Sequence, residues 1–281
     1  MDDRVVLLLG DIGVFGFKNL KEKYPDKVIN IGILEQATIG IAAGLSKEGL
    51  IPIFHSIAPF VVERALEQLK IDFCYQKLGG NFVSVGASYD YASLGCTHHC
   101  PGDVMVLKSI PSMQIVVPGH PDELDCLLKQ TFSNGLPTYF RITETSNLEK
   151  NATRFGEASV VKSGKELTVV AVGPLLDKTM EAVSCLDVTV VYYTTLSPFD
   201  SATLYKNCPS NKILVVEPFY QGTLFDSIVE SLTQKKIAMS SVGVPRRFLT
   251  NYGTREKHDL EIGLTVENIL AKALDLINAE H

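Results

Sequence analysis

The sequence predicts an α/β protein of two domains, each a mainly parallel sheet with helices on both faces. Three observations favour this fold class. Short apolar runs alternate with helical patterns along the chain. Most of these runs are apolar on both sides of the strand, as in buried parallel sheets. A polar stretch at 144–157, ETSNLEKNATRFGE, interrupts the alternation and indicates a domain boundary. We therefore expect domains over residues 1–150 and 156–281.

Each expected element follows from a local pattern. The strands of the first domain are VVLLL (5–9), VINI (28–31), IPIF (51–54), FVSV (82–85), QIVV (114–117) and TYFRI (138–142). Helical patterns lie near 33–47, 60–77 and 121–133, and the last begins with PDEL, a proline and acids in the first turn. The second domain has strands at 167–173, 188–193, 212–217 and 239–244, and helices at 174–186, 222–234 and 265–278.

The composition excludes several classes of function. The chain has 281 residues, of which 46% are apolar, and a net charge of -6, so neither nucleic acid nor an anionic membrane is an expected partner. No apolar run approaches the ~20 residues of a membrane span. The acidic start MDDR and six scattered cysteines suit a cytoplasmic protein without a secretory leader.

One carboxylate lies in unusually apolar surroundings. Glu35 belongs to VINIGILEQATIGIAAGL (28–45), and no basic residue lies within six positions of it on either side. Such a carboxylate is costly to bury unless another group pairs with it. A first-turn glutamate favoured by the helix dipole is the structural alternative. Its place after a parallel strand, at the carboxyl edge of the sheet, suits a functional site.

Two other motifs resemble functional sites, but their spacing favours a structural role. LGDIGVFG (9–16) has the spacing GxxGxxG rather than the GxGxxG of dinucleotide-binding proteins, and no acid follows the second strand. A structural turn is therefore favoured over a nicotinamide site. The residues CTHHC (96–100) are too close together for one tetrahedral ion, so a loop is favoured over a zinc site.

Several segments together resemble the transketolase-type thiamine diphosphate enzymes. GILEQ (32–36) is similar to their GIxEQ segment, and PIFHSIAPFVVERALEQL (52–69) to the aromatic-bearing segment that follows it. GCTHHCPGDVMVLKSIPSMQIVVPGHPDEL (95–124) resembles their GxTHQ run, and LPTYFRI (136–142) the last strand of the pyrimidine-binding domain. TTLSPFD (194–200) and the segment 212–232 resemble the transketolase C-terminal domain.

The resemblance implies roles for particular residues. Glu35 would bond to ring nitrogen N1′ of the cofactor's aminopyrimidine and so promote loss of the thiazolium C2 proton. Phe60 would stack on the aminopyrimidine, with Gly32 and Ile57 as further cofactor contacts. His98 matches the histidine of THQ and would be a catalytic group that also touches substrate. His99 stands where the family has glutamine, and its substrate contact is open.

The pattern departs from sugar-phosphate transketolases at two positions. Leu94 stands where they carry an Asp that reads a substrate hydroxyl, and Glu144 where they carry an Arg that binds phosphate. Arg141 lies three residues earlier and is the nearest candidate replacement. Because an anion loses affinity when its Arg becomes a carboxylate, we expect a non-standard sugar or sugar-like substrate.

The resemblance also implies partners. No GDG…N magnesium-diphosphate segment is found, so the chain is expected to be the C-terminal subunit of a split transketolase, inactive alone. A subunit with the diphosphate-binding domain would share thiamine diphosphate and hold Mg²⁺, in a dimer of heterodimers, and this chain would bind no metal. The alternatives are the beta subunit of a 2-oxoacid dehydrogenase, a deoxyxylulose-phosphate-synthase-like enzyme, and a non-catalytic scaffolding homologue.

Overall fold

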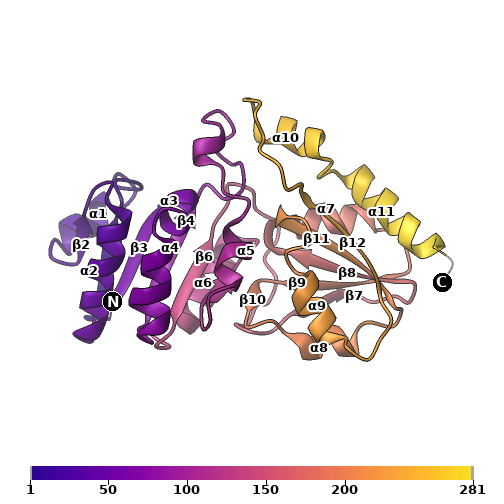
Figure 1. The fold of residues 1–281 in the computed structure, drawn as a ribbon, viewed down its shortest axis with the longest axis horizontal. Coiled ribbons are helices and arrows are strands. Elements are labelled where there is room, and N and C mark those ends of the chain that lie inside the picture. Colours follow the sequence, from indigo (N-terminus) through magenta and orange to yellow (C-terminus); the bar gives the residue numbers. More distant parts are fainter. Residues whose placement is uncertain (1, 280–281) are drawn as a thin grey trace.

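The first domain is built on a seven-stranded sheet in the order β10-β5-β6-β4-β3-β1-β2. The computed structural model describes residues 2–279 and places the two domains side by side (Figure 1). All neighbouring strands of this sheet are parallel except β10 and β5. The elements are β1 (Val5–Leu9), α1 (Lys18–Lys23), β2 (Val28–Asn30), α2 (Glu35–Lys47), β3 (Ile51–Ile57), α3 (Ala58–Val62), α4 (Leu66–Gln68), the π-helix η1 (Leu69–Tyr75), β4 (Gly80–Val85), the 3₁₀ turn η2 (Cys96–His98), α5 (Asp103–Lys108), β5 (Gln114–Val116), α6 (Pro121–Thr131) and β6 (Pro137–Arg141).

The second domain has a five-stranded sheet in the order β12-β11-β8-β9-β7. Of the described strands in this second sheet, only the edge strand β7 runs antiparallel to its neighbour. The elements are β7 (Ser159–Lys162), β8 (Leu167–Val172), the 3₁₀ turn η3 (Gly173–Leu175), α7 (Leu176–Ala182), β9 (Val188–Tyr193), β10 (Thr195–Ser197), α8 (Ser201–Lys206), β11 (Lys212–Tyr220), α9 (Phe225–Ser231), β12 (Ala238–Val244), α10 (Arg255–Ile262) and α11 (Val266–Asn278).

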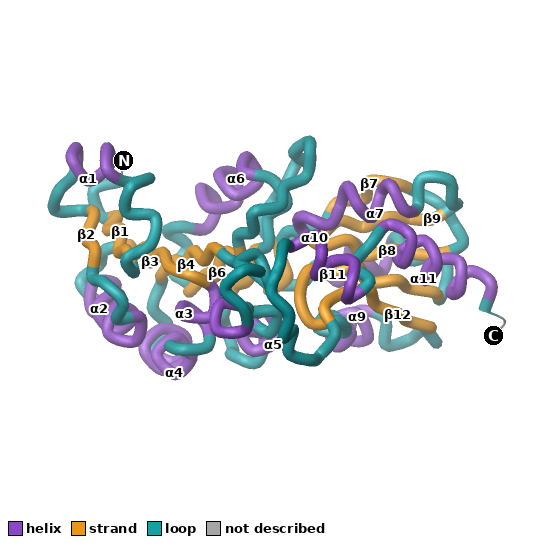
Figure 2. Tube along the Cα trace, turned by 90° about the horizontal axis from the view of Figure 1, so that it is seen from above, coloured by secondary structure: helices purple, strands orange, loops and turns teal. Residues whose placement is uncertain are grey.

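Helices cover both faces of each sheet, as Figure 2 shows for the first domain. Strand β1 shows why both faces must be covered. Its five residues are all buried, and successive side chains point to opposite faces of the sheet. Val6 and Leu8 pack with α2, α3 and α5 on one face, whereas Leu7 and Leu9 pack with α1 on the other. Helix α6 covers β5 and β6 on the same face as α1. The expected fold class is confirmed.

The single helix expected over 60–77 is wrong in detail. The chain forms α3, α4 and the π-helix η1 there. The backbone N–H groups of Glu63 and Arg64 both bond to the carbonyl of Pro59, so the helix widens after its first turn. The short elements α1, α5, β7, α8, β10 and α10 also lie outside the sequence expectation, because each is too short to show a periodicity of its own.

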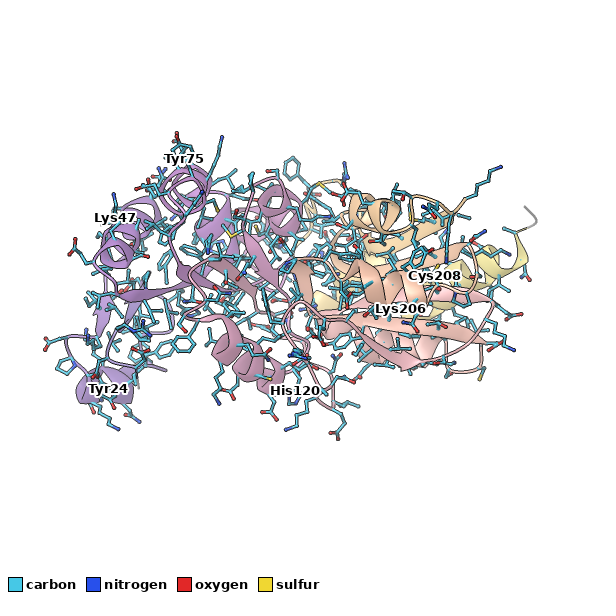
Figure 3. The ribbon with its side chains drawn as sticks, turned by 90° about the horizontal axis from the view of Figure 1, so that it is seen from below. Tyr24, Lys47, Tyr75, His120, Lys206 and Cys208 are labelled. Carbon is cyan, nitrogen blue, oxygen red and sulfur yellow. The ribbon has the colours of Figure 1, made fainter. Side chains whose placement is uncertain are left out.

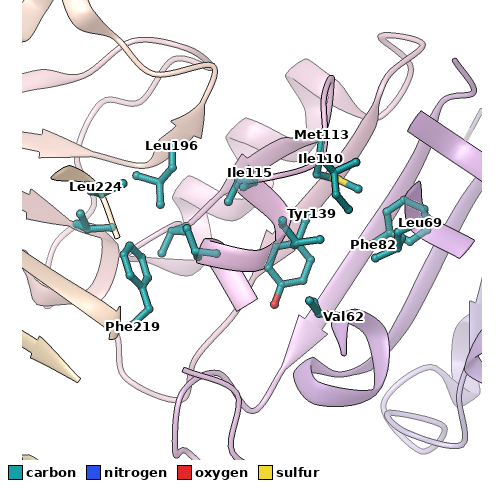
Figure 4. Close-up of a cluster of buried hydrophobic side chains, with 14 of the residues drawn as sticks. Val62, Leu69, Phe82, Ile110, Met113, Ile115, Tyr139, Leu196, Phe219 and Leu224 are labelled. Carbon is teal, nitrogen blue, oxygen red and sulfur yellow. The ribbon is translucent and has the colours of Figure 1, made fainter. Parts of the chain in front are cut away.

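One hydrophobic core runs through both domains. Strand β10 leaves the second domain and pairs antiparallel with β5 of the first sheet. Around this junction, Leu196, Phe219 and Leu224 of the second domain belong to the same buried cluster as Ile115 and Tyr139 of the first (Figure 4). The domains therefore share apolar surface that neither covers alone.

The outer surface of the molecule carries both polar and apolar side chains. Lys47 at the end of α2 and Tyr75 at the end of η1 point outward into solvent (Figure 3). Within residues 2–279, no helix has the length and apolar content that a membrane crossing requires.

Replacing Phe219 by alanine tests the shared core. Phe219 is fully buried, so Phe219→Ala should lower the free energy of unfolding by about 3–5 kcal/mol. Because the core is continuous, chemical denaturation followed by circular dichroism and by tyrosine fluorescence should show one coincident transition. Phe248, which is 75% exposed, provides the control, and Phe248→Ala should change stability by less than about 0.5 kcal/mol. Two separate transitions would contradict a shared core.

Candidate active site

Glu35 is the first residue of α2, at the carboxyl edge of the first sheet. Strand β2 ends at Asn30, and Gly32 turns the chain with φ +88° before the helix begins. A side chain at Gly32 would meet no atom within 4 Å, so the positive φ alone is what favours glycine there. The turn places the Glu35 side chain against the sheet, where it is 1% exposed.

The two carboxylate oxygens of Glu35 have different surroundings. Oε2 accepts a hydrogen bond from Nη1 of Arg64 at 2.6 Å. Oε1 is buried and has no hydrogen-bond partner among residues 2–279. A buried polar atom without a partner costs free energy, and such atoms occur where a ligand group completes the site. Oε1 is therefore free to share a proton with a ligand atom, as the ring nitrogen of an aminopyrimidine would require.

Arg64 also contacts an aromatic ring, which in turn contacts a histidine. The guanidinium of Arg64 lies 4.0 Å from the centre of the Phe60 ring on α3. The Phe60 ring meets the His98 ring edge-on at 5.4 Å between centres, and the Tyr91 ring also meets the His98 ring edge-on, at 6.2 Å. Residues from α2, α3 and the loop before α5 thus form one line of contacts. The structure brings Phe60 and His98 into contact and links Glu35 to Phe60 through Arg64.

Two more of the expected residues lie at this edge. Ile57 ends β3, is buried, and lies so close to Gly86 that a Cβ there would be 3.1 Å from its methyl group. Leu94 is 49% exposed in the loop before η2. Nδ1 of His98 lies 3.0 Å from the Thr97 hydroxyl, which orients the imidazole.

His99 points away from this line of contacts. Its ring is 7% exposed and meets the ring of His258 on α10 edge-on, with 5.5 Å between centres. Burial, and after it the neighbouring His258, lower the pKa of His99. The expected contact of His99 with substrate is therefore not supported. Among residues 2–279, no three His, Cys, Asp or Glu side chains gather as a metal site would require.

Arg141 is a structural residue in this fold. Its side chain is fully buried, and its Nε donates to Oδ2 of Asp103 at 2.8 Å. Its Nη2 donates to the Ser88 hydroxyl at 2.6 Å and to the carbonyl of Pro218 in the second domain at 3.2 Å. Because its side chain is fully buried and its Nε and Nη2 donate to groups inside the protein, Arg141 does not reach the open edge. The expectation that it binds a substrate anion is therefore not supported.

Comparison with known proteins gives the family. The family model for the transketolase pyrimidine-binding domain matches residues 1–148, and that for the transketolase C-terminal domain matches residues 156–269. The chain belongs to the transketolase family. Both the resemblance and the fold expected from it are thereby confirmed.

Similar transketolase-family proteins cover almost all of the chain. An uncharacterised 33.6 kDa protein from the fasciation locus of Rhodococcoides fascians is 38% identical over 95% of this chain and 87% of its own length. An apulose-4-phosphate transketolase subunit of Actinobacillus succinogenes is 26% identical over 91% of this chain and 86% of its own length. A solved split-gene transketolase, described as an inactive β4 tetramer, shares 25% identity, with TM-score 0.89 over 100% of this chain and 94% of its own.

The sequence analysis missed two residues of the candidate site, Arg64 and Tyr91. A helical spacing signal existed for Arg64, because it lies four residues after Phe60 and side chains at that spacing share a helix face. No local signal pairs Arg64 with Glu35, since 29 residues separate them. Tyr91 lies in a loop, where periodicity says nothing about direction.

Replacing Arg141 by methionine tests the structural role of this side chain. Arg141→Met leaves the fully buried Asp103 without its cation, so the free energy of unfolding should fall by about 3–5 kcal/mol. Arg154 forms an exposed pair with Glu157, and Arg154→Met should cost less than about 1 kcal/mol. Urea denaturation of the three proteins makes the comparison. Equal, small losses in both variants would show that Arg141 is not essential to the fold.

Proposed function

We propose that this chain is the pyrimidine-binding subunit of a heteromeric thiamine diphosphate-dependent transketolase. The observation that carries the proposal is Oε1 of Glu35, a buried acceptor without a partner at the carboxyl edge of the sheet. The family match and the similarity to a single subunit of another transketolase support it. The reaction breaks the bond between C2 and C3 of a ketose and joins the two-carbon ketol unit to the aldehyde carbon of an acceptor, without net oxidation.

Thiamine diphosphate, when bound, would supply the nucleophilic carbon and electron sink for this transfer. Glu35 would hold a proton between Oε1 and the aminopyrimidine ring, while Arg64 keeps Oε2 in place. Phe60 would offer a flat face to the same ring. His98, oriented by Thr97, would donate a hydrogen bond to the substrate oxygen beside the reacting carbon.

The other half of the site would come from a second protein. We propose that a subunit with the diphosphate-binding domain holds the diphosphate and Mg²⁺. Apolar side chains beside Glu35 are exposed in this chain, with Ile33 at 65%, Leu34 at 58% and Ile41 at 44%. Burying them against that subunit would exclude water from Glu35. A dimer of heterodimers is the assembly we propose, by the two-fold symmetry usual for such interfaces.

The place of action that we propose is the cytoplasm. All six cysteines are free, and three of them are exposed. Exposed thiols of this kind persist in a reducing compartment.

Glu35→Gln tests the catalytic role of the carboxylate. In the assembled, cofactor-loaded enzyme, glutamine cannot exchange a proton with the aminopyrimidine, so exchange of the cofactor's C2 proton should slow by ~10²- to 10⁴-fold. Exchange into deuterium oxide, followed by NMR after quenching, measures the rate. Glu48, exposed just after the same helix, gives the control Glu48→Gln, which should exchange at the wild-type rate. An unchanged rate in a loaded Glu35→Gln enzyme would rule out the assignment.

A separate prediction is that cofactor binding and ketol transfer require the second subunit. The chain alone should bind thiamine diphosphate weakly and show no ketol transfer, because it holds only the pyrimidine end. Adding the partner and Mg²⁺ should restore both. Leu34→Glu should weaken assembly measured by light scattering, whereas Leu260→Glu, exposed on α10, should not. Tight cofactor binding and turnover by the chain alone would refute the proposal.

A further inference from the structure

A hollow of about 320 Å³ lies at the carboxyl edge of the first sheet, next to the candidate site. The loop after β1 and the ends of β3, β4 and β6 form it. Gly13 and Gly86 contribute backbone, while His55, Tyr91 and Glu144 contribute polar side chains. Tyr91 also contacts the His98 ring, so the hollow continues the line from Glu35 through Phe60 and His98. It lies where the part of a substrate remote from the reacting carbon would extend.

His55 presents a hydrogen-bond acceptor to the hollow. Its Nδ1 lies 3.0 Å from the carbonyl of Val83, and a carbonyl only accepts, so Nδ1 carries the proton. Nε2 is then the unprotonated nitrogen. Burial lowers the pKa of His55, and the bond to Val83 opposes that shift, so the imidazole is neutral at pH 7. His55 therefore adds no positive charge.

Glu144 gives the hollow its charge. It is exposed and is the one acidic side chain of the lining, which contains no lysine or arginine among the residues that the structure describes. The nearby cation, Arg255 on α10, is bonded to the buried Asp90 and to the Thr143 hydroxyl. Burial, and then the charges of Glu144 and Asp90, raise the pKa of Tyr91, so its hydroxyl keeps its proton. The lining is rich in acceptors and carries net negative charge.

We infer that this hollow binds the uncharged, hydroxyl-bearing end of the acceptor substrate and rejects a phosphate. The inference rests on the proposed function and names its substrate class. Hydroxyl groups would donate to Glu144 and to Nε2 of His55, and the Tyr91 hydroxyl would donate to or accept from them. A phosphate would bring its negative charge beside Glu144, and the described residues of this lining include no cation to bind it.

The test compares two acceptors in the assembled enzyme with its cofactor and Mg²⁺. L-Erythrulose serves as donor, so transfer to D-erythrose gives glycolaldehyde and D-fructose, and transfer to D-erythrose 4-phosphate gives glycolaldehyde and D-fructose 6-phosphate. We expect kcat/KM for D-erythrose to exceed that for its phosphate by at least about tenfold. A higher kcat/KM for the phosphate would overturn this inference alone. No transfer to either acceptor would overturn the proposed function and this inference with it.

Variants at Glu144 test whether this residue causes the preference for the unphosphorylated acceptor. Glu144→Arg should raise kcat/KM for D-erythrose 4-phosphate by about tenfold or more and make inorganic phosphate a competitive inhibitor, because it adds a charge-assisted bond. Glu144→Gln should raise KM for D-erythrose and leave kcat nearly unchanged, as expected of a binding residue. The control Glu149→Arg adds the same charge on an exposed residue outside the hollow. It should leave kcat/KM for D-erythrose 4-phosphate and inhibition by inorganic phosphate unchanged. Identical effects of Glu144→Arg and Glu149→Arg would overturn the role of Glu144.

Discussion

The buried ion pair between Asp103 and Arg141 holds the parts of this protein in their relative positions. It joins α5 to β6, and through Ser88 and the carbonyl of Pro218 it also joins the loop after β4 to β11 of the second domain. Tyr139 donates a further bond to Asp103 at 2.9 Å. A buried pair of this kind adds little net stability, but leaving either charge unpaired is costly. Arrangements that separate these four segments are therefore disfavoured.

The loop that carries His98 is held at two further points. Arg255 on α10 bonds to Asp90, and the Tyr252 ring packs so closely on Gly95 that a Cβ there would lie 2.8 Å from it. In Figure 1, α10 lies on the side of the second domain that faces this loop. Held in this way, the loop presents His98 to the site and His99 to His258 in the second domain. The second domain thus positions a residue of the first.

The carboxyl edge of the first sheet has two regions with different surroundings. Around Glu35 the surface is apolar and exposed, and a buried acceptor has no partner. Around Glu144 the lining is polar and negatively charged. The first region suits a covering protein and a cofactor ring, and the second suits a small hydroxyl-bearing molecule. One sheet edge accommodates both because parallel strands end there together, with their loops side by side.

The sequence by itself determined most of the strands, the two-domain α/β class and the place of Glu35. Runs such as VVLLL are apolar on both faces, and such a pattern has few stable solutions besides a covered parallel sheet. Tertiary structure alone decided that Arg64 pairs with Glu35, that β10 joins the first sheet, that Arg141 is buried, and that His99 turns away from its neighbour. Each of these depends on which groups from distant parts of the chain meet when the core closes. Local patterns record which residues must be buried, but not which partners they meet there.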